Sequence, residues 1–322
     1  MSNKKTTIDD LLAIHGKREQ PDDLMKRRAM NNVKAHWQAN LKKQQKQKSI
    51  FQNHIFRVAA TVLFFVGVGM FLKYSEFNHT TSMFASDQFV QGEILYSIDG
   101  NSWYKSKQTY IEQGVWLKTS KDSFTNITLF DNSQLRINQN TIVEFVNLNE
   151  VRLVSGEIYH DADNASITNP LKINTSLGNI QHIGTRYLVK KSESDLQISV
   201  RNGLVEVSNG VESKQIESGK QILINAQGSQ KETNIASYDS LWNWTQNASK
   251  PFQVKDKSLN EFIIWYAHEN GYQIDWNLSQ SKTTRVKLTG NISGLSKSQQ
   301  IKTIFLSTKF DYKINQGILS IL

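Results

Sequence analysis

The residues of this sequence that come closest to a site of chemistry are His160, Asp161 and Asp163. Imidazole nitrogen and carboxylate oxygen are both metal ligands, but a single His-Asp turn is more typical of a solvated loop, so we predict no metal ion. The chain has no cysteine, which excludes disulfides, thiolate metal sites and a cysteine nucleophile. No Ser-His-Asp order, phosphate-binding loop or paired-carboxylate motif stands out. We therefore predict that the protein is not an enzyme and needs no cofactor.

The positive charge of the chain is concentrated at its N-terminal end. Residues 1–57 hold 13 of the 38 Lys and Arg residues but only 5 of the 29 Asp and Glu residues, so the remainder of the chain is nearly neutral. A nucleic-acid-binding domain would carry its basic residues on a folded surface. The distribution therefore indicates a basic arm joined to a neutral body, with no direct contact to nucleic acid.

An apolar run follows the basic arm directly. Residues 58–72 contain no charged side chain, and a helix over 55–74 would be about 30 Å long, the thickness of the hydrocarbon core of a membrane. Fifteen uncharged residues would also suit a buried core helix. The neighbouring basic block favours a single transmembrane helix, because cytoplasmic flanks of membrane spans are rich in Lys and Arg. This predicts 1–54 in the cytoplasm, 55–74 in a bacterial inner membrane and 75–322 in the periplasm.

The cytoplasmic arm is predicted to contain one long helix that begins at Pro21, Asp22 and Asp23 and runs to about Gln45. Pro21 and Asp22 favour a helix start, and lysines gather near the end, as the helix dipole prefers. The apolar residues expected near one face are Leu24, Met30, Val33, Trp37 and Leu41. Two interpretations stay open. Either the helix is solvated and its basic residues each add about 1 kcal/mol of attraction to anionic lipid, or its apolar face binds a protein partner.

Residues 89–228 show the pattern of an antiparallel β-domain. Short runs of alternating apolar and polar residues follow one another, separated by Asp-Gly, Ser-Gly and Asn-Gly turns about every ten residues. This spacing is typical of a β-sandwich, barrel or solenoid and not of βαβ units. Residues 75–88 are predicted as a linker and 229–250 as a connector to the next domain.

Five short motifs occur in this β-domain, at 129–138, 151–159, 175–189, 200–207 and 217–221. The third reads T-S-L-G-N-I-Q-H-I-G-T-R-Y-L-V. In this order the motifs resemble the FecR family of periplasmic sensor proteins. The residues that carry structural positions of the resemblance are Gly156, Gly178, Gly184, Thr185, Gly203 and Gly219. Glycine at a strand junction permits positive φ or close backbone approach, so we expect these residues to be structural and not catalytic.

Residues 251–322 are predicted as a small α+β domain built from two βαβ-like units. Strands are expected at 251–256 and 286–292, among others, and two capping boxes, Ser258-x-x-Glu261 and Ser296-x-x-Gln299, begin helices. The pattern resembles the secretin/TonB short N-terminal domain found at the C-terminus of many FecR-like proteins, which implies a protein–protein signalling module. The alternative is a domain that only caps the β-domain.

The whole chain is thus expected to be mainly β with a small α+β C-terminal domain and a single transmembrane helix. The resemblance implies a signal-transduction protein that regulates an extracytoplasmic-function sigma factor, as an anti-sigma factor or sigma regulator, through protein–protein binding. The implied partners are a sigma factor in the cytoplasm and a periplasmic or outer-membrane protein such as a TonB-dependent receptor, and the basic arm adds an anionic lipid surface. The same architecture would also suit a membrane-anchored structural or adhesion module of the cell envelope without cytoplasmic output.

Overall fold

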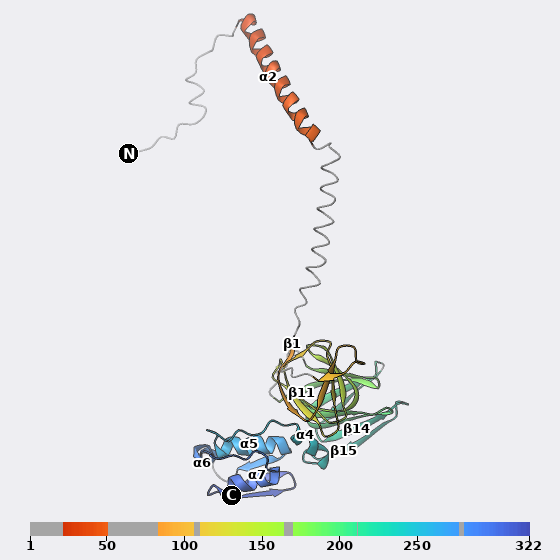
Figure 1. Cartoon of the computed structure of the whole chain (residues 1–322), viewed down its shortest axis with the longest axis vertical. Coiled ribbons are helices and arrows are strands. Elements are labelled where there is room, and N and C mark those ends of the chain that lie inside the picture. The colour runs from red at the N-terminus through yellow and green to blue at the C-terminus, as the bar shows by residue number, and fades with distance from the viewer. Residues whose placement is uncertain (1–21, 51–82, 106–109, 164–169, 211, 277–279) are drawn as a thin grey trace, which may run out of the picture. The chain divides into compact units, whose positions relative to one another are not determined.

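The computed structural model describes residues 22–50, 83–105, 110–163, 170–210, 212–276 and 280–322, with side chains except at 41–50, 83–88 and 183. The chain divides into two units, Met1–Thr80 and Thr81–Leu322. Figure 1 shows the described helix of the first unit and the strands and helices of the second. The predicted membrane span at 55–74 lies outside the described residues. Among the helices of the described ranges, none is both long and apolar enough to cross a membrane.

The first unit contains helix α2, Asp23–Ile50. It begins where the sequence predicts and continues beyond the predicted end at Gln45. Asp23 lies in the first turn, where the helix dipole favours an acidic residue, and its carboxylate lies 3.9 Å from the ammonium group of Lys26. Both side chains are exposed, so this ion pair adds little to the stability of the helix.

Fifteen strands of the described part of the second unit form one sheet, which confirms the prediction of a mainly β protein. Their bounds are β1 Met83–Gln91, β2 Ile94–Ser97, β3 Tyr104–Lys105, β4 Ile111–Glu112, β5 Trp116–Thr119, β6 Phe124–Leu129, β7 Gln134–Ile137, β8 Ile142–Asn147, β9 Glu150–Asp161, β10 Lys172–Thr175, β11 Gly178–Lys191, β12 Asp195–Ser208, β13 Ser213–Glu217, β14 Lys220–Asn225 and β15 Gln230–Asn234. The main path of neighbours is β15-β14-β12-β11-β10-β9-β7-β6-β1-β4. Pairing is antiparallel except between β9 and β10.

The sheet extends beyond the predicted β-domain at both ends. β1 begins inside the stretch 75–88 and pairs with β6, and β15 lies inside the stretch 229–250 and pairs with β14. Neither strand has a regular alternation of apolar and polar residues. The two segments are therefore recognised as strands by their pairing with β6 and β14, and not by their sequence patterns.

The strands share one apolar interior, and four neighbouring strands, β7, β9, β11 and β12, have a second covered face. The residues of these strands that pair in register and face the interior are Leu135, His160, Tyr187 and Val200. Successive side chains on a strand point to opposite faces. The neighbours of these residues therefore face outward, and they are Arg136, Asp161, Arg186 and Arg201.

The C-terminal domain, which we define as residues 251–322, has a three-stranded sheet with the order β16-β18-β17. The bounds of its elements are α5 Leu259–Asn270, β16 Gln273–Trp276, α6 Gln280–Arg285, α7 Lys297–Leu306, β17 Tyr312–Asn315 and β18 Ile318–Ile321. Both predicted capping boxes form, at the starts of α5 and α7, and Gly271 ends α5 with a φ of 68°. A core of its own, with Phe262, Ile304 and Leu319 among its buried members, holds the helices to the sheet.

The predicted pair of βαβ units is wrong, because the strands expected at 251–256 and 286–292 do not form. One isolated bridge pairs Lys287 of the second segment with Ser258, which lies just beyond the first. Val254 and Leu288 from the two segments are buried in the core of the C-terminal domain. Their apolar pattern therefore reflects packing against the helices and not pairing in a sheet.

The connector between the two domains contains two short helices, η1 Ser240–Trp242 and α4 Asn243–Asn247. Trp242 is buried and packs with Tyr159 and Leu188, which lie on the outer face of β9 and β11. Its indole N–H donates to the carbonyl oxygen of Ala236 at 2.9 Å. This tryptophan therefore fixes the connector against the sheet and sets where the chain enters the C-terminal domain.

Candidate functional site

The apolar residues predicted on the arm are exposed on α2. Met30, Val33 and Trp37 have exposed fractions of 70%, 69% and 67%. At about 100° per residue of an α-helix, these three lie within about 60° of one another, whereas Leu24 lies roughly 140° from the middle of that stripe. Leu24 is therefore on a different face from the one predicted. The side chain of Leu41 lies outside the described ones.

Three of the glycines that carry the FecR resemblance, Gly156, Gly184 and Gly203, lie inside β9, β11 and β12 and not between strands as predicted, whereas Gly219 lies in the turn between β13 and β14. Those with positive φ are Gly156, Gly184, Gly203 and Gly219. A Cβ atom on Gly203 would lie 2.5 Å from the carbonyl oxygen of Gly184, so no other residue fits there without a backbone shift. Buried Thr185 donates from Oγ1 to the carbonyl oxygen of Leu204 at 2.7 Å, and Gly178 begins β11 without positive φ. These six residues hold strands together and line no site.

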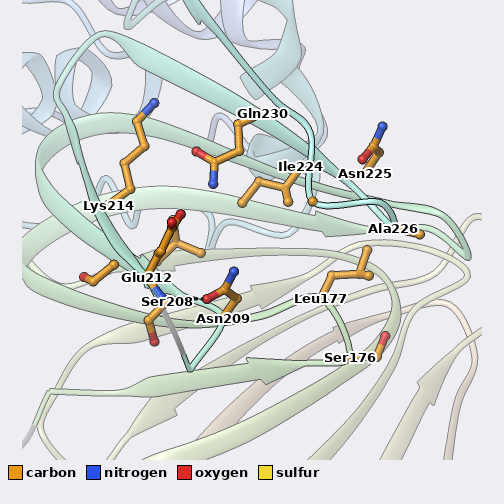
Figure 2. Close-up of a pocket in the computed structure, with 13 residues that line it drawn as sticks. Ser176, Leu177, Ser208, Asn209, Glu212, Lys214, Ile224, Asn225, Ala226 and Gln230 are labelled. Atoms are coloured by element: carbon orange, nitrogen blue, oxygen red, sulfur yellow. Dashed lines mark hydrogen bonds between the residues drawn. The ribbon is translucent and has the colours of Figure 1, made fainter.

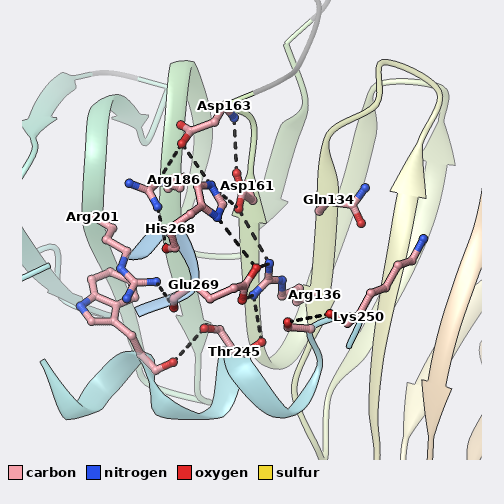
Figure 3. Close-up of polar contacts among 12 residues, drawn as sticks. Gln134, Arg136, Asp161, Asp163, Arg186, Arg201, Thr245, Lys250, His268 and Glu269 are labelled. Carbon is pink, nitrogen blue, oxygen red and sulfur yellow. Dashed lines mark hydrogen bonds and ion pairs between the residues drawn. The ribbon is translucent and has the colours of Figure 1, made fainter. Parts of the chain in front are cut away.

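Charged side chains on the outer face of the sheet meet the C-terminal end of α5 (Figure 3). We call this group the junction cluster, and its members are Arg136, Asp161, Asp163, Arg186, Arg201, His268 and Glu269. The first five come from the β-domain and the last two from α5. The side chains of Arg136 and Glu269 are only 5% and 6% exposed, so the cluster is an interior feature between two domains.

The strongest contact of the junction cluster joins β7 to α5. Arg136 donates from Nη1 and Nη2 to the two carboxylate oxygens of Glu269, each at 2.8 Å. A bidentate guanidinium–carboxylate pair fixes direction as well as distance. Nη1 of Arg136 also donates to the carbonyl oxygen of Thr245 in α4 at 3.0 Å. One arginine thus holds the connector and the C-terminal domain together.

A second group of contacts lies around His268. Its Nε2 is 3.4 Å from a carboxylate oxygen of Asp161 and 3.2 Å from one of Asp163. The Nε of Arg186 lies 3.0 Å from the same oxygen of Asp163. Figure 3 shows the imidazole directed between the two carboxylates and the guanidinium. The two aspartates therefore balance an imidazolium and a guanidinium from opposite sides of the junction.

Arginines of the sheet also bind the carbonyl groups at the end of α5. Arg186 donates to the carbonyl oxygen of His268 at 3.0 Å, and Arg201 donates to that of Glu269 at 3.3 Å. The last carbonyls of a helix have no partner within it and carry partial negative charge. The two guanidinium groups satisfy these carbonyls and neutralise that charge. The sheet thereby caps a helix that belongs to the other domain.

The charges of the junction cluster hold one another in their ionised forms. Burial would raise the pKa of Glu269, but the charge of Arg136 lowers it well below its ordinary value. Burial would lower the pKa of His268, but its contacts with Asp161 and Asp163 raise it to about 11. Burial lowers the pKa of Lys297 to about 7, against the attraction of Glu269 4.0 Å away. Lys297 is thus the cation beside the cluster that changes charge near neutral pH.

Asp161, Asp163 and His268 also have ligand atoms within 4.8 Å of one another, close enough for a metal ion. A metal would need the neutral imidazole. The contacts of His268 with Asp161 and Asp163 raise its pKa to about 11, so the imidazole is held protonated at neutral pH. Arg186 already occupies the space beside Asp163. The arrangement is therefore an ion-pair cluster. The positive charge that a metal ion would bring is supplied by the protonated imidazole of His268 and the guanidinium groups of Arg136 and Arg186.

The strands that carry this geometry are also the ones recognised by comparison with known families. Residues 116–206 match the family model described as FecR protein. This part of the β-domain is thus similar to the FecR family, and we call the β-domain that contains it the FecR domain. All three arginines and both aspartates of the junction cluster lie within the matched residues, and His268 and Glu269 lie outside them.

Two crystal structures, at 1.65 Å and 2.50 Å resolution, of a protein assigned as an anti-sigma factor in Parabacteroides distasonis ATCC 8503 are similar to this chain. Each is 17% identical with a TM-score of 0.35, and the matches cover 64% of this chain and 98% and 97% of theirs. No curated protein sequence matches the chain significantly. The FecR assignment therefore rests on the family model and the motifs.

The sequence predicts that Asp161 and Asp163 lie together with His160. The two aspartates do lie together, but His160 is not their partner. His160 faces the interior, where its Nε2 lies 2.9 Å from Oγ of buried Ser133 and its ring packs against that of His182. The partner of the two aspartates is His268, which is more than one hundred positions later in the chain. Adjacent residues on a strand face opposite sides, so His160 and Asp161 could not act together.

The arginines of the FecR domain and Glu269 were not predicted. One signal was present: each arginine stands directly beside an apolar or aromatic residue of its strand that is buried, namely Leu135, Tyr187 or Val200. A charged residue in such a strand needs a partner. The sequence did not reveal which residue that partner is.

The β-domain also has a groove of about 410 Å³ near its β-turns (Figure 2). Asn209 and Asn225 line it, but the side chain of Asn209 accepts from the backbone N–H of Glu212 and that of Asn225 from Ser229, each at 2.8 Å. These side chains close their own turns. These two asparagines therefore have a structural role in the wall of the groove.

Proposed function

We propose that this chain is an envelope signalling protein that regulates an extracytoplasmic-function sigma factor by direct binding. The observation that carries the proposal is the match of residues 116–206 to the FecR family. The basic arm with α2 would lie in the cytoplasm, 55–74 would span the inner membrane, and the FecR and C-terminal domains would lie in the periplasm. The function is one of binding, without catalysis.

The sigma factor would bind the exposed stripe of α2. Met30, Val33 and Trp37 present three large apolar side chains on one side of a helix that has no other described element in its unit. Charge alone would not distinguish a protein from a lipid surface, because both are anionic partners for a basic helix. The apolar stripe supplies the specificity, because a central tryptophan often carries a large share of binding energy.

The C-terminal domain would receive the signal at the other end of the chain. Its resemblance to the secretin/TonB short N-terminal domain supports a contact with a periplasmic or outer-membrane protein such as a TonB-dependent receptor. Its own core and two capped helices make it a stable surface for such a contact. The FecR domain would then stand between the receiving domain and the membrane.

Capture of a sigma factor by the full chain in detergent tests the proposal. The sigma factor to use is the extracytoplasmic-function type encoded beside this chain's gene. Trp37→Ala should weaken capture by about thirtyfold or more, which corresponds to about 2 kcal/mol. Leu24→Ala, a similarly exposed change on the other face of α2, is the matched control and should change affinity little. Binding only to anionic vesicles, with no capture of sigma factor, would favour the anchor function and overturn the proposal.

The membrane topology is tested separately with a reporter enzyme that is active only in the periplasm. A fusion after Leu322 should be active and a fusion after Lys48 inactive, because the basic block holds the arm on the cytoplasmic side. The opposite pattern of activity would remove the route by which a periplasmic contact reaches a sigma factor.

A further inference from the structure

The contact between the FecR domain and the C-terminal domain is made mainly by charges. The buried apolar residues of the described chain fall into separate clusters, one inside the β-domain and one inside the C-terminal domain. The third, small cluster around Trp242 fixes the connector to the sheet. Between the FecR domain and α5 lies the junction cluster, in which Arg136, Arg186 and Arg201 supply the contacts. No apolar cluster of the described residues spans both domains.

Several buried polar atoms of this junction have no hydrogen-bond partner. They are Nε of Arg136, Nε of Arg186, Nε2 of His268 and Nζ of the adjacent Lys297. Nε of Arg186 and Nε2 of His268 nevertheless lie in ion pairs, 3.0 and 3.2 Å from a carboxylate oxygen of Asp163. A buried donor without a well-aligned hydrogen bond costs free energy. At these atoms the junction is therefore held mainly by ion pairing.

Buried ion pairs give specificity to a contact more than stability. The cost of removing both charges from water offsets most of their attraction, whereas the loss of one member leaves the other buried without a partner. The docked position of α5 is thus well defined but weakly favoured, and it depends on complete pairing. Glu269 is the centre of this dependence, because Arg136 binds it in bidentate fashion and Arg201 binds its carbonyl oxygen.

The C-terminal domain does not need the junction for its own fold. Its core residues are supplied by 252–321, its three strands pair only with one another, and the capping boxes of α5 and α7 lie within it. Glu269 contributes no apolar contact to that core. Loss of the junction would therefore release an intact domain and leave it attached through the connector.

We propose that the junction cluster is a releasable latch that docks the folded C-terminal domain on the FecR domain and lets it separate when the pairing of Glu269 with Arg136 is lost. Release would expose three arginines on the FecR domain and the end of α5 at the same time. The latch is a property of the FecR and C-terminal domains alone. Its test is independent of whether α2 binds a sigma factor.

The experiment measures the distance between the two domains in the full chain. Because the native chain has no cysteine, Ser194→Cys on the FecR domain and Lys302→Cys on α7 can carry two spin labels without further changes. Both positions are exposed and outside the junction cluster. The parent protein should give one narrow distribution of distances between the two spin labels, measured by pulsed electron–electron double resonance. Glu269→Gln should shift the ratio of docked to released molecules by about 100-fold or more and add a broad population.

Two further variants separate a latch from a general loss of structure. Glu232→Gln removes a carboxylate from a surface ion pair with Lys214 and Lys220, and as the matched control it should keep the narrow distribution. Arg136→Gln combined with Glu269→Gln removes both members of the bidentate pair, so neither is left buried without the other, and this double variant should be docked more than either single variant.

An unchanged narrow distribution in Glu269→Gln would overturn the proposal. So would the loss of near-ultraviolet circular dichroism throughout the chain, because it would show that the junction is a folding contact. A broad distribution with native circular dichroism, partly reversed in the double variant, supports the latch.

Discussion

Buried histidines differ in charge between the two faces of β7, β9, β11 and β12. On the inner face of β9, burial lowers the pKa of His160 well below its ordinary value and that of neighbouring His182 to about 4, so both rings are neutral. On the outer face, the carboxylates of Asp161 and Asp163 raise the pKa of His268 to about 11. Burial disfavours the charged form at both places. Fixed opposite charge outweighs it only at the junction.

The two faces should therefore differ in how strongly substitutions affect stability. The inner face is apolar and close-packed, so its stability comes from many contacts that no single residue controls. The outer face depends on a few charges in a fixed arrangement. Substitutions on the outer face should therefore have large effects when they leave a charge unpaired, and the inner face should tolerate loss of a polar atom that has no partner.

The largest effect is expected from Arg136→Met. It leaves the carboxylate of Glu269 buried without its bidentate partner, which should lower the free energy of unfolding by about 3–5 kcal/mol. Urea unfolding followed by the fluorescence of Trp242, which lies beneath Arg201, measures the loss. Arg152→Met is the matched control on β9. Its guanidinium pairs with Glu144 on the surface, so the change should be below about 1 kcal/mol. Equal effects of the two variants would show that burial of the charge does not matter.

The next effect concerns the junction of β11 and β12 that brings Arg186 and Arg201 to one face. Gly203→Ala should cost about 2–4 kcal/mol, because Ala is strained at a φ of +85° and its Cβ would meet a backbone oxygen. Gly184→Ala is its control in the same bulge. It has positive φ but open space around it, so it should cost only about 1–2 kcal/mol. Thermal unfolding of both variants decides the matter, and a larger loss for Gly184→Ala would contradict the geometry described here.

A pH-dependent effect is expected from the inner histidines. Between pH 6.5 and about 4 the unfolded chain binds a proton that folded His182 does not, so its contribution to stability is present above pH 6.5 and falls as the pH is lowered. The loss is about 1.4 kcal/mol per pH unit. His182→Phe should remove this part of the slope of unfolding free energy against pH. An unchanged slope would show that His182 is charged in the folded state.

His268, the outer histidine, should change the pH dependence of the unfolding free energy in the opposite direction. The proton on His268 is retained in the folded state while the unfolded chain loses it above pH 6.5, so this contribution is complete below pH 6.5 and is lost as the pH rises through about 11. His268→Gln should therefore flatten the alkaline side of the same curve and leave the acid side unchanged.

The smallest effect is expected from Tyr187→Phe on the inner face. The phenolic oxygen of Tyr187 is fully buried and has no hydrogen-bond partner. Removing it should change the unfolding free energy by less than about 1 kcal/mol, in the stabilising direction, because a buried unsatisfied hydroxyl is lost. A clear destabilisation in calorimetry would reveal a partner for the hydroxyl and would make the inner face more polar than its contacts indicate.

Local patterns of the sequence determined much of the fold. Alternation and turn residues predicted the β-domain, and the glycines at 156, 184, 203 and 219 were expected where positive φ is found. Ser258 with Glu261, and Ser296 with Gln299, marked the starts of α5 and α7. These features could be predicted because each depends on residues only a few positions apart.

Only the tertiary structure decided the junction. Arg136 and Glu269 are separated by 133 positions, and nothing in either local pattern indicates the other. Segment 286–292 has the pattern of a strand but packs against helices, because no neighbouring strand is available to pair with it. The alternation in β9 also breaks from Ile158 to Asp161, where every residue is buried, because the C-terminal domain and the connector cover the outer face. A sequence pattern records how apolar a residue is, whereas the partner of a buried charge is set by which distant surfaces the fold brings together.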